Sequence, residues 1–538
     1  MSPEAAAALQ QTRFSTIDGI IVVVYLALSL LIGVMVRRYA RNMTAYVGAD
    51  RKIGTWLGVA TMLGTEMGLV TVMYSAQKGF TGGFAAFHIA LIAGVTTLII
   101  GATGFIVGPL RRARVLTIPE YYEKRFSRRV RVLGGCILAF GGILNMGLFL
   151  KVGSKFIVGI TGLSGEGWAL PSVMVALLLL VLVYTALGGM ISVILTDYVQ
   201  FVVLSFGILV ATGMAIAKLG WFHIFETTHT VLGDAGFNPV AEGSGFGWSY
   251  VLWMFVTAGL VGCAVWPTAV SRALAMESEK AVRRQYMVSS ISFTVRFMIP
   301  YFWGICALVF IHASPEGADL KALFFPPEGS GVEAVDNLYA LPVFLGRLLP
   351  PVLIGIITAA MIAAFMSTHD SYFLCWSSVI TQDIVAPLRG KRGLSEAARV
   401  RLTRLIIFAL GGYVLYWGLF YEGSDDIWDY MAVTGAIYFN GAIAVLVGGI
   451  YWKRASRAGA MAALVAGCTA VFGLGPVQQL VGLQTRDPAT GEWVQRLTGA
   501  QVGLMSVGLA FAVMVVFSLA MPDRRPSVSE GETSSPAS

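Results

Sequence analysis

A few charged side chains lie inside long apolar segments, where a charge is costly unless it is paired or does chemistry. Glu66, Asp197 and Asp370 carry short side chains that cannot easily reach an aqueous surface. We therefore expect them to handle an ion or a polar solute, or else to pair with Arg296 or a lysine. The remaining ionisable groups of this kind are Lys151, Lys155, His88 and His369, of which the two lysines are long enough to reach a surface instead.

Glu66 is flanked by glycines in the segment Gly64-Thr-Glu-Met-Gly68. Glycine tolerates backbone conformations that interrupt a helix, and an interrupted helix exposes carbonyl oxygens. Such backbone deep in an apolar segment is tolerated only where it lines a cavity or is buried in protein. The pattern predicts a broken helix with a carboxylate at the break. The alternative is a glycine-faced contact between intact helices.

A later segment carries small residues in a stripe at helical spacing. The members of the stripe are Ala364, Ser367, Thr368, Ser371 and Cys375. Hard cations prefer oxygen ligands, and Na⁺ is one of them. Hydroxyls that face opened backbone carbonyls would provide about five such ligands. Plain helix packing is the alternative explanation of the stripe.

The elements that must position these groups are membrane-spanning helices. Hydrophobic residues make up 56% of the 538-residue chain and charged residues 13%, against roughly 25% in a soluble domain. The mean hydropathy is +0.74, and the apolar runs reach about 20 residues, the length of a transmembrane helix. We predict an all-α polytopic membrane protein with about 13 transmembrane helices, at residues 18–36, 53–77, 83–109, 132–160, 168–187, 190–218, 247–271, 286–312, 350–385, 402–420, 427–451, 458–480 and 500–521.

The basic residues indicate the orientation. With the N-terminus outside, the predicted cytoplasmic segments hold 28 of the 38 Lys and Arg residues and the outer segments about seven. This bias is typical of multi-pass proteins of the cell membrane, and it places the C-terminus in the cytoplasm. It also explains the net charge of +8, so we expect the lipid bilayer, and no nucleic acid, as the partner of the positive charge.

A second interruption follows in the segment 259–268, where Pro267 removes a helix hydrogen bond. Two interrupted helices at corresponding positions of two five-helix groups favour an inverted-repeat transporter with a site at mid-membrane. The predicted domains are an N-terminal segment with an extra helix and cytoplasmic loop (1–52), a first repeat (53–218), an outer loop (219–246), a second repeat (247–451), two additional helices (452–521) and a disordered cytoplasmic tail (522–538).

Other chemistries find little support. The five cysteines lie in apolar runs without a CxxC pair, which predicts small packing residues and no disulfide framework. The spans contain no metal motif and no nucleophile constellation, so we expect no enzymatic activity and no organic cofactor.

Between residues 18 and 455 the chain resembles the sodium:solute symporter family, whose core is the inverted-repeat fold of leucine-transporter type. The segments that carry the resemblance are Gly188-Gly-Met-Ile-Ser-Val-Ile-Leu-Thr-Asp-Tyr-Val-Gln200, Ser271-Arg-Ala-Leu-Ala275, Arg296-Phe-Met-Ile-Pro-Tyr301, Met366-Ser-Thr368 with Asp383, and Gly449-Ile-Tyr-Trp-Lys-Arg454. The resemblance implies a 5+5 core with two discontinuous helices.

The resemblance also implies ligands. It implies a Na⁺ site formed by the backbone carbonyls of Gly64, Met67 and Ala364 and the hydroxyls of Ser367 and Thr368. It further suggests a second cation site, a proton site or an inner exit path at Asp197, Asp370 and Ser371. Glu66 would meet the ammonium of a solute or hydrogen-bond the unwound backbone. Sugar transporters of the family carry an acidic residue and an asparagine where this chain has Ala90 and Trp266-Pro-Thr268, which weighs against a sugar.

We therefore predict a secondary active transporter that couples Na⁺ to a small polar solute, an amino acid or organic carboxylate, and for which a monomer suffices. The residues expected at the solute site are Glu66, His88, Asn145, Trp266, Thr268, Arg296, Tyr438 and Asn440. Proton coupling through Glu66 and Asp370 is the alternative within transport. A membrane sensor of the same fold is a weaker alternative, since no output domain is evident.

Overall fold

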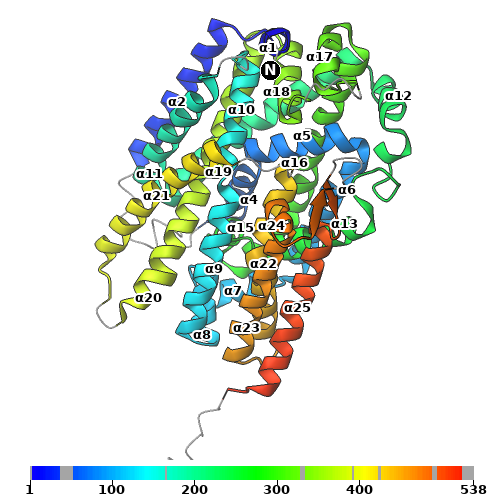
Figure 1. Ribbon diagram of the computed structural model, residues 1–538. Helices are drawn as coiled ribbons and strands as arrows, with labels where there is room; N and C mark the ends of the chain where they lie inside the picture. Colours follow the sequence, from blue (N-terminus) through cyan, green and yellow to red (C-terminus); the bar gives the residue numbers. More distant parts are fainter. Residues whose placement is uncertain are drawn as a thin grey trace, which may run out of the picture.

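The computed structural model describes residues 3–36, 53–163, 167–327, 334–390, 393–421, 426–486 and 493–523, without the side chains of 186–201 and of a few other positions. The described chain is almost entirely helical (Figure 1). A two-stranded antiparallel sheet pairs β1 (Gln484–Arg486) with β2 (Trp493–Gln495). Nine of the described helices are long and apolar enough to cross a membrane, and four apolar helices are shorter. These helices overlap every predicted span, which confirms the all-α polytopic class but not the number of 13 spans.

The first predicted interruption is present. α4 (Thr55–Glu66) ends directly before Met67 and Gly68, and α5 (Leu69–Gly82) begins after them. The one-turn helix η3 (Gly83–Ala86) leads into α6 (Phe87–Thr103). In Figure 1, α5 crosses the middle of the molecule, so the break lies deep inside the bundle.

Helices α7 (Val107–Arg112) and α8 (Ile118–Arg125) lead to α9 (Arg128–Met146) and α10 (Phe149–Thr161). The next helical segment, α11, runs without interruption over Ala169–Leu219, where two spans are predicted. A straight helix of 51 residues would be about 77 Å long, well beyond the roughly 30 Å of a hydrocarbon core.

The contacts at its two ends show that α11 changes direction. Thr12 bonds to the carbonyl of Ile160 at the end of α10, shortly before α11 begins. Lys218, at the other end of α11, pairs with Glu316, which also pairs with Arg13. Both ends of α11 therefore lie beside the segment 12–13, on one side of the molecule.

The two limbs of α11 both pack along α19 (Leu353–Val379). Thr185 bonds to Asp370, and Gly207 packs against Ile357. α11 therefore contacts α19 on both sides of the predicted boundary at Gly188-Gly189.

The second repeat begins with the second interruption. α13 (Gly247–Trp253) continues through the π-helical segment η5 (Met254–Val261) and α14 (Gly262–Val265), and the chain breaks at Trp266 before α15 (Pro267–Ala275). Both predicted discontinuous helices are thus confirmed.

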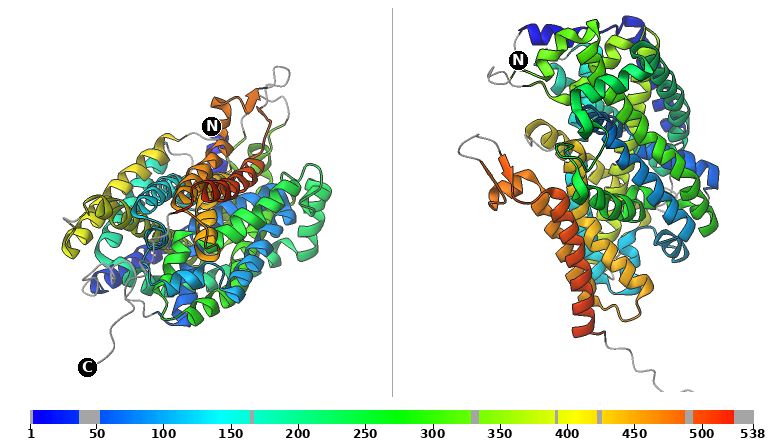
Figure 2. Two further views of the ribbon diagram at one scale, coloured as in Figure 1. Left: turned by 90° about the horizontal axis from the view of Figure 1, so that it is seen from below. Right: turned by 90° about the vertical axis from the view of Figure 1, so that its right-hand side faces the viewer.

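The remaining helices complete the core and its edges. The helices of the second repeat are α16 (Glu279–Ala313), α19 with η8 (Ile380–Val385) and α20 (Ala386–Leu388), α21 (Glu396–Phe420) and α22 (Ile427–Tyr451). The peripheral elements are α1 (Pro3–Gln10), α2 (Thr16–Val36), α12 (Trp221–Leu232), η4 (Gly233–Gly236), η6 (Pro315–Gly317), α17 (Ala318–Phe324), η7 (Asn337–Tyr339), α18 (Ala340–Leu348), α23 (Arg457–Gly467), η10 (Cys468–Gly473), α24 (Gly475–Leu480) and α25 (Gly499–Ala520). Helix α25 packs along α22 and α23 at one side of the bundle (Figure 2).

Candidate functional site

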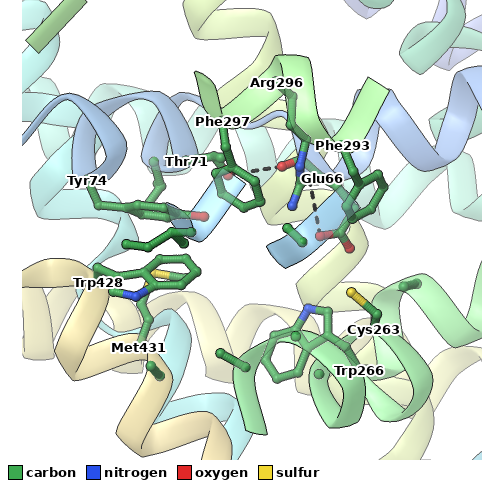
Figure 3. A pocket seen from close by; sticks show the side chains of 18 of the residues that line it. Glu66, Thr71, Tyr74, Cys263, Trp266, Phe293, Arg296, Phe297, Trp428 and Met431 are labelled. Atoms are coloured by element: carbon green, nitrogen blue, oxygen red, sulfur yellow. Dashed lines mark hydrogen bonds and ion pairs between the residues drawn. The ribbon is translucent and has the colours of Figure 1, made fainter. Parts of the chain in front are cut away.

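A cavity of about 140 Å³ lies where the two interrupted helices meet (Figure 3). Its walls come from α4, α5, α6, α9, α10, η5, α14, α15, α16, α19 and α22. One water molecule needs roughly 10–15 Å³ measured in this way, so the space suits a small organic solute rather than a single ion.

The first break exposes backbone beside the cavity. The last bond of the α4 ladder runs from the Met67 N–H to the Leu63 carbonyl at 2.8 Å, and the ladder resumes with Val72 N–H to Gly68 O at 3.1 Å. Met67 leaves the helical conformation at φ −95°, ψ 60°, and Gly68 is extended. The Thr71 hydroxyl donates to the Glu66 carbonyl at 3.0 Å, which stabilises the bend from within.

The hydroxyl stripe of α19 faces this break. A Cβ atom on Gly68 would overlap Oγ1 of Thr368, so the two helices touch at this point. Thr368 lines the cavity and donates to the Ala364 carbonyl at 3.0 Å, and Ser367 is fully buried. The structure thus places the break at Met67 and Gly68 against the helix that contains the three other predicted Na⁺ ligands, and Gly64 lies in the last turn of α4 just before this break.

The second break meets the first through Glu66. Trp266 has φ −59° and ψ 118°, and Pro267 opens α15. The Thr268 hydroxyl, in the first turn of α15, donates to Oε1 of Glu66 at 3.1 Å. A single carboxylate therefore joins the end of α4 to the start of α15.

Arg296 of α16 is the cationic partner of Glu66. Its Nη1 lies 3.5 Å from Oε2 of Glu66, and the two side chains are 6% and 15% exposed. Phe293 and Phe297 hold the guanidinium at 4.0 and 4.3 Å from their ring centres, within the range of a cation–π contact. The contact of Glu66 with Arg296, expected as the alternative to ion or solute handling, is therefore present, and Figure 3 shows both side chains at the cavity.

Asn145 and Trp266 also line the cavity. The Nδ2 of Asn145 donates to the Met431 carbonyl at 2.7 Å and to the Thr434 hydroxyl at 3.0 Å. Its Oδ1 is buried and has no hydrogen-bond partner among the described residues. Trp266 contacts Phe439 with its ring edge at 5.0 Å between centres.

Four residues predicted at the solute site are not among those that line the cavity: His88, Thr268, Tyr438 and Asn440. Thr268 still reaches the site through its hydrogen bond to Glu66. His88 bonds to the Ala85 carbonyl and packs on aromatic rings. The Tyr438 hydroxyl bonds to that of Tyr122, and Asn440 donates to the Gly503 carbonyl. Their polar groups serve helix packing, because each side chain points toward a neighbouring helix rather than the cavity.

The predicted second cation or proton site stays untested. Asp370 accepts a hydrogen bond from Thr185 of α11. Ser371 instead accepts from Nη2 of Arg272 in α15 at 2.6 Å, since consecutive residues of a helix point about 100° apart. The side chain of Asp197 lies outside the described residues.

Sequence reasoning missed a charged cluster beyond the cavity. Lys78 is predicted in an outer loop, but it lies within α5, where it is 7% exposed and contacts Asp426 and Asp429 at 2.7 and 2.8 Å. The Tyr250 hydroxyl bonds to Asp429 as well, at 3.2 Å. The acidic segment before α22 was the available signal, but nothing in the sequence pointed to its partner.

Several aromatic residues of the wall were also missed. Tyr74, Phe297 and Trp428 line the cavity, with Tyr74 and Trp428 at 4.8 Å between ring centres (Figure 3). Aromatic residues are common in every span, so their type alone marks no position.

Comparison with known proteins agrees with this architecture. The model of the sodium:solute symporter family matches residues 46–467. The bovine sodium/mannose cotransporter SLC5A10 is 26% identical over 85% of this chain and 78% of its own length. The sodium/pantothenate symporter of Haemophilus influenzae is 23% identical over 84% of this chain and 89% of its own length.

Solved structures show the same fold. A Na⁺-coupled sialic acid symporter in a substrate-bound, outward-open state superposes with a TM-score of 0.73 at 19% identity, over 94% of this chain and 98% of the other. The nucleobase-cation symporter MHP1 gives a TM-score of 0.52 at 12% identity, over 88% of this chain and 94% of the other. With two interrupted helices that meet at a cavity and a family match over most of its length, this chain belongs to the sodium:solute symporter family.

Proposed function

We propose that the protein is a Na⁺-coupled symporter that carries a small polar organic solute, an amino acid or an organic carboxylate, by alternating access. One observation carries the proposal. The break between α4 and α5 presents opened backbone to the hydroxyls of α19 on one side and the Glu66 carboxylate to the cavity on the other. Ion and solute would therefore share one interrupted helix.

The ion-binding part of the proposal uses five oxygen atoms. The carbonyls of Gly64, Met67 and Ala364 and the hydroxyls of Ser367 and Thr368 would surround Na⁺, which is a transported ion here. Oxygen ligands suit a hard cation such as Na⁺, and four of the five residues, all except Met67, are buried.

The solute part rests on the cavity walls. Glu66 and Arg296 supply opposite charges and most other lining side chains are apolar or aromatic. A sugar needs many neutral hydroxyl and amide partners, and in the described wall the Thr71 and Thr368 hydroxyls and the Asn145 amide already donate to backbone carbonyls. An amino acid or a carboxylate has charged groups that match the two side chains.

Coupling would follow from the shared helix. Na⁺ bound at the break would order the end of α4 and the start of α5, and this order places Glu66 for the solute. Entry of one positive charge across 100 mV releases about 2.3 kcal/mol, which corresponds to about fifty-fold accumulation of solute per ion.

We expect one chain to suffice for this activity, because both interrupted helices and the charged residues between them belong to the same chain. We assign the two five-helix repeats to residues 53–218 and 247–451, with the N-terminus outside the cell membrane and the C-terminus in the cytoplasm.

Uptake by the full-length protein in proteoliposomes tests the proposal. We expect accumulation of an amino acid or organic carboxylate that depends on an inward Na⁺ gradient and increases with an inside-negative potential. Uptake that ignores Na⁺ but follows a pH gradient would instead favour proton coupling through Glu66 and Asp370.

A further inference from the structure

The cavity holds one charge of each sign. Among the described residues that line it, Glu66 and Arg296 alone carry charged side chains. Their closest atoms are 3.5 Å apart, longer than the 2.7–2.9 Å of a strong charge-assisted hydrogen bond. The wall is therefore neutral overall, but it presents a loosely paired anion and cation side by side.

The Arg296 guanidinium is held in place with donors to spare. Phe293 and Phe297 restrain it from the flanking positions of α16. Nη1 makes the contact with Glu66, and Nε is buried without a hydrogen-bond partner among the described residues. A guanidinium has five N–H donors in a planar fork that matches a carboxylate, so a solute carboxylate would satisfy donors that the protein does not.

Glu66 retains acceptor capacity in the same way. Oε1 accepts one hydrogen bond from Thr268 and Oε2 has only the long contact with Arg296, whereas a carboxylate has about four acceptor sites. Asn145 adds a buried Oδ1 without a donor among the described residues. These acceptors on the cavity wall suit an ammonium group.

The charge balance separates the classes of solute. A carboxylate without an amine would be attracted by Arg296 and repelled by Glu66, and an amine without a carboxylate would meet the reverse situation. A solute with both charges satisfies both residues. Because Glu66 and Arg296 are in contact, the two charged groups of the solute must also lie close together. They do so in an α-amino acid, where both are attached to one carbon, but not in an extended γ-amino acid.

The remaining wall of the cavity determines which kind of solute side chain can bind. Large apolar residues surround the charged pair, among them Met254, Met431, Phe149, Phe439, Trp266 and Trp428. No further charged residue of the described wall could neutralise an acidic or basic side chain. Burial of a charge without a partner is costly, so an apolar side chain fits.

We propose that the cavity selects α-amino acids with an apolar side chain, with the ammonium on Glu66 and the carboxylate on Arg296. This inference rests on the proposed Na⁺-coupled symport and narrows its substrate class. Glu66 and Arg296 are then the residues that determine specificity.

The test uses full-length protein in proteoliposomes with an inward Na⁺ gradient. L-Leucine and L-phenylalanine are the probes, and the analogues each change one feature of L-leucine. 4-Methylpentanoate lacks the amine, 3-methylbutylamine lacks the carboxylate, 3-(aminomethyl)-5-methylhexanoate keeps the isobutyl group but is a γ-amino acid with separated charges, and L-glutamate has a charged side chain. We expect Na⁺-dependent uptake of the probes, and at least tenfold weaker competition by each analogue. Competition by 4-methylpentanoate equal to that by L-leucine, or uptake of glucose in place of the probes, would overturn the inference.

Two variants test the assignment of the charges. Glu66→Gln should weaken L-leucine competition at least tenfold relative to 4-methylpentanoate, because the repulsion of a simple carboxylate disappears. Arg296→Gln should likewise weaken competition by L-leucine at least tenfold relative to competition by 3-methylbutylamine, because the repulsion of a simple amine disappears. Glu279→Gln is the control and should change neither ratio. Glu279 does not line the cavity, and its carboxylate pairs with Arg112 at a distance of 2.7 Å. Unchanged ratios in both cavity variants would refute the assignment.

Thermal stabilisation by Na⁺ alone separates the two levels of the argument, and it also shows that each variant is folded. If Na⁺ stabilises the protein and drives uptake of glucose or of 4-methylpentanoate only, this inference fails and the proposed symport stands. If Na⁺ neither stabilises the protein nor drives uptake of any of these solutes, the proposed function fails and the inference fails with it.

Discussion

Gly68 and Thr368 face each other with no room for a methyl group between them. Gly68 opens α5 and Thr368 belongs to the hydroxyl stripe of α19. This contact joins the break in the first interrupted helix to the helix that carries the proposed Na⁺ hydroxyls. The spacing of the two helices at this point therefore sets the geometry of the proposed ion site.

Gly68→Ala should impair Na⁺ binding more than folding. The new methyl group would overlap the Thr368 hydroxyl, and relief of the overlap would move α5 away from α19. Overpacking of this kind costs about 1–3 kcal/mol, and we expect the Na⁺ concentration for half-maximal uptake to rise at least tenfold. Gly213→Ala is the control, because nothing lies within 4 Å of a Cβ at that glycine. Equal Na⁺ dependence in both variants would contradict the proposed site.

Ser367→Ala and Thr368→Ala should each raise the Na⁺ requirement without preventing membrane insertion. Each change removes one proposed oxygen ligand and leaves the helix in place. Uptake measured against Na⁺ concentration gives the result, and Ser377→Ala is the matched control, since Ser377 is a buried serine of α19 whose hydroxyl bonds to the Leu374 carbonyl. The site assignment is wrong if the control and the two variants behave alike.

Lys78→Met should make the cavity easier to reach. Lys78 ties α5 to the start of α22 through Asp426 and Asp429, and loss of one partner of a buried ion pair is strongly destabilising because the other charge remains. We expect at least a threefold faster reaction of Cys263, which lines the cavity, with an impermeant maleimide in a chain whose other cysteines are serine. Lys155→Met serves as the control, because its pair with Asp336 joins α10 to η7 instead. An unchanged rate would show that the Lys78 cluster does not restrict access.

The predicted orientation has a direct test with single cysteines. Glu226 on α12 belongs to the predicted outer loop 219–246, Ala397 on α21 lies just before the predicted span 402–420 on its cytoplasmic side, and both side chains are exposed. In intact cells, a cysteine at 226 should react with an impermeant thiol reagent and one at 397 should react only after permeabilisation. The reverse pattern would place the N-terminus in the cytoplasm and refute the interpretation of the Lys and Arg bias.

Substitutions of Asp197 and Asp370 should show whether transport is coupled to a second Na⁺ or to a proton. A second Na⁺ predicts a Hill coefficient above one that falls toward one in Asp197→Asn. A proton on Asp370 predicts a coefficient near one and a loss of transport as the pH rises, which Asp370→Asn would shift or remove. Uptake at several Na⁺ concentrations and pH values measures both. If both variants retain the native Na⁺ and pH dependence, the two acids are structural.

The sequence by itself determined the class of the fold and the two interruptions. Apolar runs of about 20 residues have one stable form in a bilayer, because lipid offers no hydrogen bonds to the backbone. Gly64, Gly68 and Pro267 act on their own stretch of chain, so the broken helices were predictable where they occur. The stripe with Ser367 and Thr368 is likewise a property of one helix.

Only the tertiary structure decided which side chains meet. Glu66 contacts Thr268 and Arg296, which are 202 and 230 positions away in the chain, and Lys78 reaches Asp426 across 348 positions. A polar residue in an apolar run signals that it needs a partner, but not in which direction the partner lies. Tyr438 and Asn440 found theirs in neighbouring helices, because the rotation of each helix about its axis is set by packing against the others and not by its own sequence.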